Sequence, residues 1–362
     1  MNGKKSRVLV AMSGGVDSSV AAALLLEAGY EVIGATMQLW PKNADAPEHE
    51  SGCCALSAVE DARRTARQLG IAYYVLNFQD VFEEKVIRPF ILEYKCGRTP
   101  NPCIACNQVV KFEHLMAKAL ALDCRYLATG HYARIVFDES AQKYRLCRGI
   151  DAAKDQSYFL YRLKQRDMRG ILFPLGKWTK KQVRDMAAAY RLSVAAKAES
   201  QEICFVINNE YRDFLRRQAP DCITPGNFVD LGGKVLGRHE GIAFYTVGQR
   251  KGLGLQSKKP LYVVDIRPET NIVVVGEVDE VYAAGLKAGD LNWVAGEPEE
   301  ELADIKVKIR STAPMAEADV CIKEGGAEVI FKEPQRAVTP GQAAVFYRGD
   351  CVLGGGTILG SL

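Results

Sequence analysis

The chain has 362 residues, of which 48% are hydrophobic and 25% charged, and its formal net charge at pH 7 is +3. This composition is typical of a globular protein with room for two or three domains. No apolar run approaches the roughly 20 residues that would span a bilayer. A charge this small does not predict nucleic-acid binding, which must rest on local basic segments. Eleven cysteines without a secretory signal favour a reducing cytoplasm over a disulfide scaffold.

The first distinctive feature is a glycine- and serine-rich loop between a strand and a helix. Residues 8–10 suit a strand buried in a parallel sheet, and residues 20–28 are strong helix formers. Residues 13–19 lie between them, where glycine permits close backbone approach and helix N–H groups attract anions. A tight turn capped by Asp17 or Ser18 would have the same composition. The loop alone therefore predicts either a phosphate site or a structural turn.

The loop is not the common GxxxxGK[ST] phosphate loop, because no lysine follows its glycines. The sequence Ser13-Gly-Gly-Val-Asp-Ser-Ser resembles the loop of the N-type ATP pyrophosphatases, which cleave ATP between its α and β phosphates. This resemblance implies that the loop cradles the departing pyrophosphate and that Asp17 helps to hold its Mg²⁺.

Strand and helix patterns alternate after this loop. Strands are predicted over residues 31–37, 71–78 and 125–129, and helices over residues 57–69, 80–94 and 107–120. Such alternation predicts an α/β fold with a doubly wound, mostly parallel sheet. Ligands of such sheets bind at the carboxyl ends of the strands. The loop at Ser13, Met37 and the pair Gly130-His131 would all lie on that edge.

The pattern changes in the second half of the chain. Residues 208–259 are mixed, and short β-prone runs follow at 262–266, 272–275, 305–309, 328–331 and 343–347. These runs predict a small all-β barrel. We therefore expect a catalytic domain of the ATP pyrophosphatase type over residues 1–206, a small mixed central domain over 207–268 and a C-terminal β-barrel over 269–362.

The cysteines carry the second chemical signal. Prolines on both sides of Asn101 predict a rigid loop, and Cys103 and Cys106 form a C-x-x-C just before a helix. A helix N-terminus lowers a thiol pKa. The pair could be half of a structural zinc site, but the sequence has no second C-x-x-C and no closely spaced histidines. Cys204 by itself resembles a buried core cysteine.

An ordered set of motifs extends over almost the whole chain. They are Ser13-Gly-Gly-Val-Asp-Ser-Ser, Thr99-Pro-Asn-Pro, Cys106-Asn, Lys111-Phe, Ala128-Thr-Gly-His-Tyr, Lys154-Asp-Gln-Ser-Tyr-Phe-Leu, Cys204-Phe, Gly248-Gln-Arg-Lys-Gly-Leu-Gly, Thr339-Pro-Gly-Gln and Gly354-Gly-Gly. This set resembles the bacterial tRNA-specific 2-thiouridylases, which replace the 2-oxygen of the wobble uridine with sulfur in the tRNAs for Lys, Glu and Gln. The resemblance implies a cytoplasmic, tRNA-binding sulfurtransferase that uses ATP and Mg²⁺. Its sulfur would come from a partner such as a cysteine desulfurase or a sulfur-relay protein.

The resemblance also implies roles for individual residues. ATP would contact Ala11, Met12, Ser13, Gly14, Gly15, Val16, Asp17, Ser18, Met37 and Gly130. The target base would meet Asn101, Pro102 and Cys103, and tRNA would contact His131, Lys154, Asp155, Gln156, Arg310, Ser311 and Gln342. Cys106 matches the nucleophile and Cys204 the persulfide carrier. Considered without the family, residues 154–156 are a loop linker and His131 is a structural histidine.

Two sulfur chemistries remain open. Adenylation makes the uracil 2-oxygen part of a leaving group, after which a Cys204 persulfide supplies sulfur and Cys106 resolves the disulfide-type linkage. Many family members carry aspartate where this chain has Cys103, so Cys103, Cys106 and Cys204 could instead ligate an iron–sulfur cluster with one open iron.

Two other functions share part of this pattern. An amide-forming adenylating ligase would have the same loop but would need neither Cys106 nor Cys204. A non-catalytic RNA-binding protein with a vestigial nucleotide site is the other alternative. The basic segments 162–169, 212–217, 250–251 and 258–259 suit an RNA backbone or a solvated face. The sequence assigns no role to Cys53 and Cys54.

Overall fold

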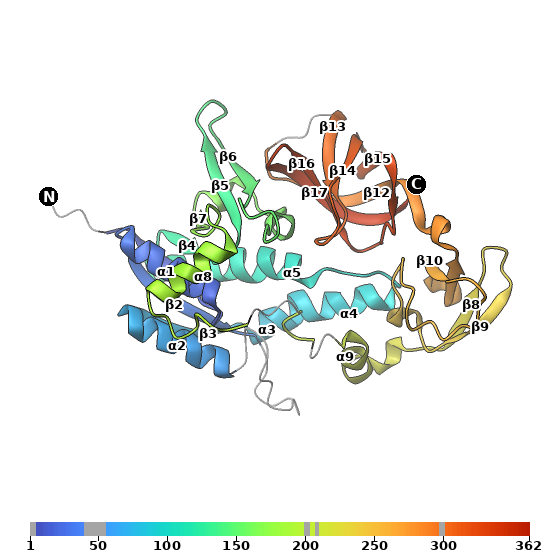
Figure 1. The fold of residues 1–362 in the computed structure, drawn as a ribbon, viewed down its shortest axis with the longest axis horizontal. Coiled ribbons are helices and arrows are strands. Elements are labelled where there is room, and N and C mark those ends of the chain that lie inside the picture. The colour runs from blue at the N-terminus through green and yellow to red at the C-terminus, as the bar shows by residue number, and fades with distance from the viewer. Residues whose placement is uncertain (1–4, 40–55, 199–202, 207–209, 297–300) are drawn as a thin grey trace.

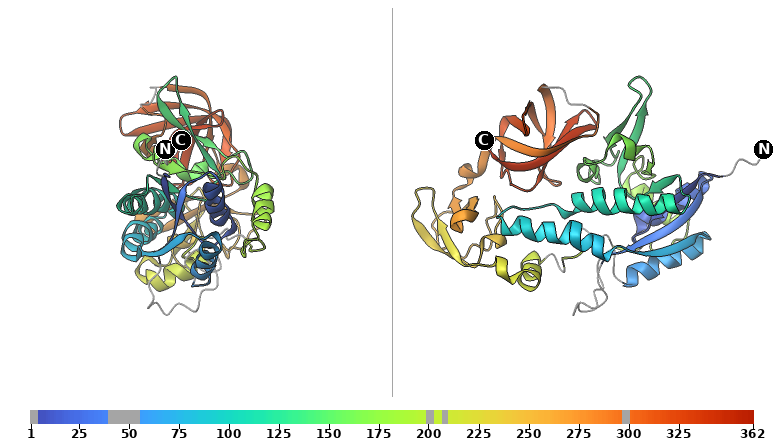
Figure 2. Two further views of the ribbon diagram at one scale, coloured as in Figure 1. Left: turned by 90° about the vertical axis from the view of Figure 1, so that its left-hand side faces the viewer. Right: turned by 180° about the vertical axis from the view of Figure 1, so that it is seen from behind.

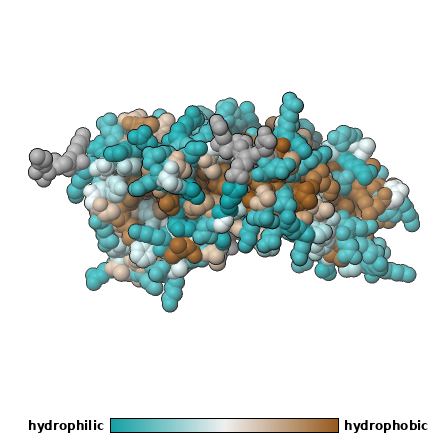
Figure 3. Space-filling view, turned by 90° about the horizontal axis from the view of Figure 1, so that it is seen from above, coloured by the Kyte–Doolittle hydropathy of each residue, from teal (hydrophilic) through white to brown (hydrophobic). Residues whose placement is uncertain are grey.

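A computed structural model describes residues 5–39, 56–198, 203–206, 210–296 and 301–362. The molecule is elongated, with an α/β domain at one end, a small sheet at the other and a barrel beside the connection between them (Figure 1). Cys53 and Cys54 lie outside the described residues. No helix in the described ranges combines the length and apolar composition that crossing a membrane requires. The face in Figure 3 is mostly hydrophilic, with scattered hydrophobic patches.

The α/β domain is built on a five-stranded parallel sheet. Its strands are β1 (Arg7–Ala11), β2 (Glu31–Gln38), β3 (Ala72–Asn77), β4 (Tyr126–Ala128) and β7 (Ile171–Leu172), in the order β3-β2-β1-β4-β7. Val8 and Val10 face α1 (Val16–Glu27) and α2 (Leu56–Leu69), whereas Leu9 packs in the core on the other face. Because both faces are buried, the strands are apolar throughout. The predicted doubly wound parallel sheet is confirmed.

Two long helical segments cover the second face and extend away from the sheet side by side (Figure 2). The first consists of α3 (Gln79–Phe82), the π-helical η1 (Glu83–Ile87) and α4 (Arg88–Lys95); the second consists of α5 (Pro102–Ala105), the π-helical η2 (Cys106–Leu115) and α6 (Met116–Ala121). The second segment begins earlier than the sequence predicted. Asn101 is its N-cap and accepts a hydrogen bond from the Cys103 N–H at 3.2 Å.

The prediction that the C-x-x-C precedes a helix is therefore wrong. Proline suits the first position of a helix because its fixed φ is already helical and it has no N–H to satisfy. Pro102 thus opens the helix that the sequence analysis placed after it. Cys103 lies in the first turn and Cys106 continues the same helix.

The far end of the molecule is a small four-stranded sheet. Its strands are β8 (Gly226–Val229), β9 (Val235–His239), β10 (Tyr262–Arg267) and β11 (Ile272–Gly276), in the order β10-β11-β8-β9. Residues 262–266 and 272–275, predicted as barrel strands, belong to this sheet instead. β11 pairs antiparallel with β10 but parallel with β8, which lies far from it in the sequence. A short apolar run identifies a strand without identifying the sheet that it joins.

The C-terminal part forms the predicted antiparallel barrel. Its strands are β12 (Tyr282–Trp293), β13 (Glu301–Lys308), β14 (Ala316–Lys323), β15 (Gly326–Arg336), β16 (Ala343–Arg348) and β17 (Cys351–Ser361), and pairing of β12 with β17 closes it. A hairpin of β5 (Ala133–Asp138) and β6 (Lys143–Arg148) from the α/β domain continues the barrel sheet through β17. Among the described residues, the further helical elements are η3 (Ser157–Leu160), α7 (Gln165–Met168), α8 (Lys180–Ala189), α9 (Tyr211–Gln218), η5 (Pro220–Cys222), η6 (Ile242–Phe244), η7 (Pro268–Thr270) and η8 (Val278–Val281).

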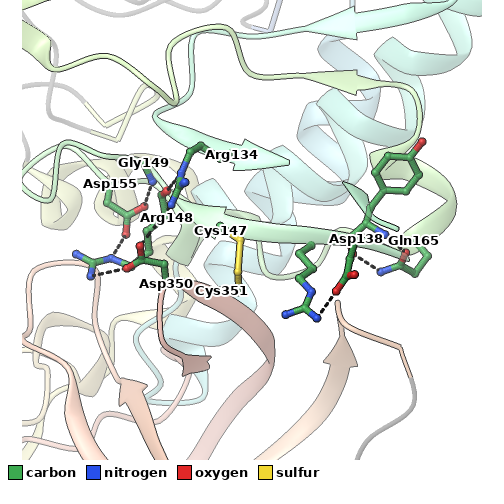
Figure 4. The surroundings of a disulfide bond; sticks show 11 residues. Arg134, Asp138, Cys147, Arg148, Gly149, Asp155, Gln165, Asp350 and Cys351 are labelled. Atoms are coloured by element: carbon green, nitrogen blue, oxygen red, sulfur yellow. Dashed lines mark hydrogen bonds and ion pairs between the residues drawn. A yellow bond between two sulfur atoms is a disulfide. The ribbon is translucent and has the colours of Figure 1, made fainter. Parts of the chain in front are cut away.

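A disulfide between Cys147 and Cys351 joins β6 to β17 (Figure 4). The two cysteines are 204 residues apart and lie opposite each other in the antiparallel pair. Beside them the Arg148 N–H donates to the Asp350 carbonyl at 2.8 Å, and Arg134 pairs with the Asp350 carboxylate at 3.4 Å. The sequence analysis expected reduced cysteines. Only the tertiary pairing of β6 with β17 brings these two together.

We predict that Cys351→Ala lowers the free energy of unfolding by about 2–4 kcal/mol, because the cross-link restricts a long loop of the unfolded chain. Denaturant unfolding of oxidised protein measures this difference, which should vanish in a strong thiol reductant. Cys96→Ala, at an exposed cysteine outside the disulfide, is the control. Recovery of Cys147 and Cys351 as separately alkylated peptides from oxidised protein would contradict the prediction.

Candidate active site

The carboxyl ends of β1 and β4 form the point at which the strand order of the sheet reverses. From β1 the chain proceeds to β2 on one side, whereas β4 pairs with β1 on the other. Loops that leave such a pair of strands diverge and create a binding crevice. Gly130 follows β4, and a Cβ on it would lie only 2.9 Å from the Asp17 carbonyl carbon. The predicted ATP residues of the two loops therefore meet at this edge, with Met37 at the end of the adjacent β2.

The loop after β1 is held in a compact shape by its own polar groups. The Ser13 N–H donates to the Ser18 hydroxyl at 3.1 Å, and that hydroxyl donates to the Gly15 carbonyl at 3.2 Å. Gly14 has φ +69°, and a Cβ there would lie 2.1 Å from the Ala58 carbonyl oxygen. The N-cap of α1 is Gly15, so the alternative of a turn capped by Asp17 or Ser18 does not describe this structure. A helix N-terminus without a capping side chain is suited to an anion.

The strand that leads into the loop is anchored in the sheet. The predicted ATP residue Ala11 is the last residue of β1. Met12, also predicted to contact ATP, follows it and is buried. The Met12 N–H donates to the Ala35 carbonyl at 2.8 Å, and its carbonyl accepts from the Thr36 hydroxyl at 2.7 Å. Val16 is buried at the start of α1. The loop therefore rises from a rigid base.

Asp17 has two partners that the sequence analysis missed. The Lys180 ammonium lies 2.7 and 2.8 Å from its two carboxylate oxygens, and the Tyr132 hydroxyl donates to it at 2.8 Å. Lys180 is 9% exposed and is the first residue of α8, whose N-cap is Thr179. The capping box of Thr179 with Gln182 marks the start of a helix in the sequence. No local signal connects that helix to a loop 163 residues earlier.

A second lysine also reaches the loop. The Lys197 ammonium donates to the Gly14 carbonyl at 3.1 Å and pairs with Asp61 at 2.6 Å. Together with Lys180 it places two cations beside the glycines. Each is paired with a carboxylate, Lys180 with Asp17 and Lys197 with Asp61, and neither follows the glycines in the sequence.

Mg²⁺ fits this site only in part. Asp17 supplies one carboxylate, and in the described residues no group of three or more His, Cys, Asp or Glu side chains could hold a metal ion. Mg²⁺ is commonly held by one or two carboxylates together with substrate phosphates. A nucleotide would therefore have to complete its coordination.

The cysteine segments pack against the same helical segment. Cys103 is exposed, whereas Cys106 and Cys204 are half-buried. α5 contacts η1, and Phe205 packs edge-on against Phe82 and Phe90, with ring centroids 5.6 and 5.1 Å apart. The segments that carry Cys106 and Cys204 are thus both supported by the helix over residues 79–95. The three cysteines do not constitute a metal-binding group within the described part of the chain.

The helix that carries Cys106 passes the edge of the sheet where the predicted ATP residues lie. Its Phe112 ring lies 6.2 Å from the ring of His131, centroid to centroid. His131 is buried, and the Thr129 hydroxyl lies 2.6 Å from its Nδ1. Burial, with a contribution from Lys111, holds the pKa of His131 well below its ordinary value, so the ring is neutral at pH 7. One helix therefore connects the predicted nucleophile to the predicted nucleotide site.

Asp155 and Gln156, predicted to contact tRNA, are bonded within the chain. The Asp155 carboxylate accepts from the Ser157 hydroxyl at 2.9 Å and from Arg148 at 3.3 Å. Gln156 Oε1 accepts from the Tyr132 N–H at 3.0 Å. Lys154 is half-buried in the same loop. The loop over residues 154–156 therefore supports Tyr132, which precedes β5 and whose hydroxyl donates to Asp17.

The predicted tRNA residues of the barrel lie where it contacts the other domains. Arg310 donates to the carbonyls of Val247 and Ala337 at 3.1 and 2.9 Å. Burial lowers the pKa of Arg310 from its ordinary value. Gln342 Nε2 donates to the Thr99 carbonyl at 2.8 Å, and Ser311 is half-buried next to Arg310.

Comparison with known proteins places the chain in a family. Its sequence matches the models of a tRNA methyl transferase HUP domain over residues 6–208, a tRNA methyl transferase PRC-barrel domain over 212–277 and an aminomethyltransferase β-barrel domain over 283–358. It is 57% identical to the tRNA-specific 2-thiouridylase MnmA of Carboxydothermus hydrogenoformans, over 98% of both chains. The chain belongs to the tRNA-specific 2-thiouridylase family.

Further relatives cover the chain equally well. The family member of Acetivibrio thermocellus is 54% identical over 98% of this chain and 99% of its own length. That of Heliobacterium modesticaldum is 55% identical over 99% of this chain and 94% of its own length. The similarity to 2-thiouridylases therefore extends over all three parts of the molecule.

We predict that Lys180→Met reduces ATP-dependent turnover about tenfold to hundredfold, because it leaves the partly buried Asp17 carboxylate without its cation. Steady-state kinetics at varied ATP concentration measure the effect, and Lys180→Arg should retain more activity. Lys181→Met, at the exposed neighbouring residue, is the matched control. Equal turnover of Lys180→Met and Lys181→Met would show that the ion pair has no part in ATP use.

Proposed function

We propose that this protein uses ATP to replace the 2-oxygen of the wobble uridine with sulfur in the tRNAs for Lys, Glu and Gln. One observation carries the proposal. In a chain 57% identical to a tRNA-specific 2-thiouridylase, the helix that carries Cys106 also lies against His131 at the edge formed by the glycine loop. The 2-oxygen is activated and replaced by sulfur on the same uracil, so the glycine-loop site and Cys106 must act on one base.

The glycine loop suits the phosphates of ATP. The N-terminus of α1 and the ammonium groups of Lys180 and Lys197 would stabilise the pyrophosphate as it leaves. Residues 11–18, Met37 and Gly130 would surround the nucleotide. Mg²⁺, held by Asp17 and the phosphates, would neutralise charge on the leaving group. The products are pyrophosphate and a tRNA whose uracil 2-oxygen is bonded to AMP.

Sulfur would then be transferred through two cysteines. The terminal sulfur of a Cys204 persulfide attacks C2 of the adenylated uracil, and AMP leaves with the 2-oxygen. The Cys106 thiolate next attacks the Cys204 sulfur, which forms a Cys106–Cys204 disulfide and releases the 2-thiouridine with the electron pair of the broken S–S bond. A thiol reductant restores both cysteines. A cysteine desulfurase or a sulfur-relay protein would then reload Cys204.

The helical segment over residues 102–121, which we call the cysteine helix, would receive the base at its start. Asn101 and Pro102 form its first residues, and the exposed Cys103 follows them. The wobble base would leave its stack to reach this point. The proposal takes the persulfide route, and an iron–sulfur cluster on Cys103, Cys106 and Cys204 stays a prediction of the sequence.

We assign activation and sulfur chemistry to residues 1–206, and tRNA recognition in part to residues 207–268 and 269–362. His131, Lys154, Asp155, Gln156, Arg310, Ser311 and Gln342 would shape or contact the tRNA surface. The intramolecular bonds of Asp155, Gln156 and Arg310 favour a shaping role for these three side chains.

We predict that Cys204→Ser abolishes 2-thiouridine formation, while ATP and tRNA still yield the adenylated tRNA and pyrophosphate. Cys106→Ser should still accept a persulfide on Cys204 and fail to turn over. Mass spectrometry of the tRNA and of the Cys204 peptide separates these steps. Cys96→Ser serves as the control because Cys96 is exposed and has no role in the proposal. Thiolation by Cys204→Ser at the normal rate would overturn the persulfide route.

A further inference from the structure

Thr99 links all three parts of the molecule. Its N–H donates to the Pro340 carbonyl at 2.9 Å, and its carbonyl accepts from Gln342 Nε2 at 2.8 Å. Its hydroxyl donates to the Thr246 hydroxyl at 3.1 Å. Every polar group of Thr99 is thus bonded to another domain. We call Thr99, Thr246 and residues 340–342 the Thr99 junction.

The junction is closely packed at Gly341. This residue has φ +90°, and a Cβ on it would lie 2.9 Å from the Thr99 nitrogen and 3.0 Å from the Thr99 carbonyl carbon. Real Cβ atoms do not approach a backbone nitrogen so closely, and the φ value favours glycine. The barrel backbone therefore contacts the α/β domain here without an intervening side chain.

Arg310 links the two domains to which Thr99 is bonded, the central domain and the barrel. It donates to Val247 of the central domain and to Ala337 of the barrel, and it also bonds to the Thr339 hydroxyl. A Cβ on Gly248 would lie 2.4 Å from the Ala337 Cβ. The central domain and the barrel segment that leads to Gly341 therefore present a single rigid surface to Thr99.

The connection from Thr99 to the cysteine helix is short and stiff. Asn101, the N-cap, follows Thr99 after one residue, and Cys103 and Cys106 come next. Pro100 and Pro102 restrict the backbone of this link. A shift at Thr99 would therefore move the start of the helix, whereas the glycine loop is held separately by Lys180 and Lys197.

We propose that the Thr99 junction is a positioning element for sulfur transfer. It fixes the start of the cysteine helix against the barrel and the central domain, so that the Cys106 thiolate keeps a constant separation from the Cys204 sulfur that is linked to a base presented by these domains. This inference rests on the proposed function and deepens it. It gives Gln342 the role of holding Thr99, in place of the direct tRNA contact that the family resemblance implies.

Gln342→Glu and Gly341→Ala test the proposal. The first removes the donor to the Thr99 carbonyl at nearly constant size, and the second forces the two backbones apart. In single-turnover assays we expect 2-thiouridine formation to fall on the order of 10- to 100-fold, because small displacements of reacting groups have effects of this size. The tRNA affinity of Gly341→Ala and the rate of tRNA adenylation in both variants should stay within about twofold of wild type.

Two further comparisons separate positioning from general damage. Gly325→Ala carries the same φ penalty, since Gly325 has φ +83°, but its Cβ would meet nothing within 4 Å and the variant should thiolate normally. Thr99→Ser retains the hydroxyl bonded to Thr246 and should be more active than Thr99→Val. Circular dichroism and thermal unfolding confirm that each variant is folded.

The rate of Cys106 alkylation by iodoacetamide, followed by mass spectrometry, tests the junction without any turnover. It should change in Gly341→Ala and Gln342→Glu and stay constant in Gly325→Ala. This readout distinguishes failure of the junction from failure of the proposed function, because it needs neither tRNA nor ATP. An unchanged alkylation rate overturns the proposal. A weaker tRNA affinity with unchanged thiolation of bound tRNA also overturns it and assigns Gln342 to tRNA binding.

Discussion

Parallel pairing of β1 with β2 on one side and β4 on the other is the constraint on which the active-site arrangement depends. Two loops that are far apart in the sequence leave adjacent strand ends and meet, so that Gly130 lies against Asp17. The apolar residues of β1 enforce this pairing because both of its faces are buried. The partners of Asp17, which are Tyr132 and Lys180, are positioned by chain that follows β4.

The cysteine helix extends this edge to the rest of the molecule. Its middle lies against His131 at the nucleotide edge, and the chain just before its start is bonded to both other domains at Thr99. A single helix therefore relates the site that we propose for oxygen activation to the surface on which we propose that tRNA is held. Its early start at Pro102 places Cys103 and Cys106 on the helix itself.

The barrel is attached to the α/β domain at two separate places. The Cys147–Cys351 disulfide joins the sheets through β6 and β17, and the Thr99 junction joins the loops. The barrel is therefore held to the α/β domain at two points rather than one. Such an arrangement suits an enzyme in which one substrate spans several domains.

The sequence by itself determined what depends on local pattern. The glycine loop between strand and helix, the alternation of a parallel sheet, the C-terminal barrel and the family all follow from neighbouring residues and their order. Local pattern misplaced the start of the cysteine helix, because a proline can either stiffen a loop or occupy the first position of a helix. Only the tertiary structure decided which strands share a sheet, and so moved residues 262–266 and 272–275 out of the barrel. It also paired Lys180 with Asp17 and Cys147 with Cys351 across 163 and 204 residues. Contacts at such separations depend on how whole elements pack, and no periodicity or motif near either residue records the partner.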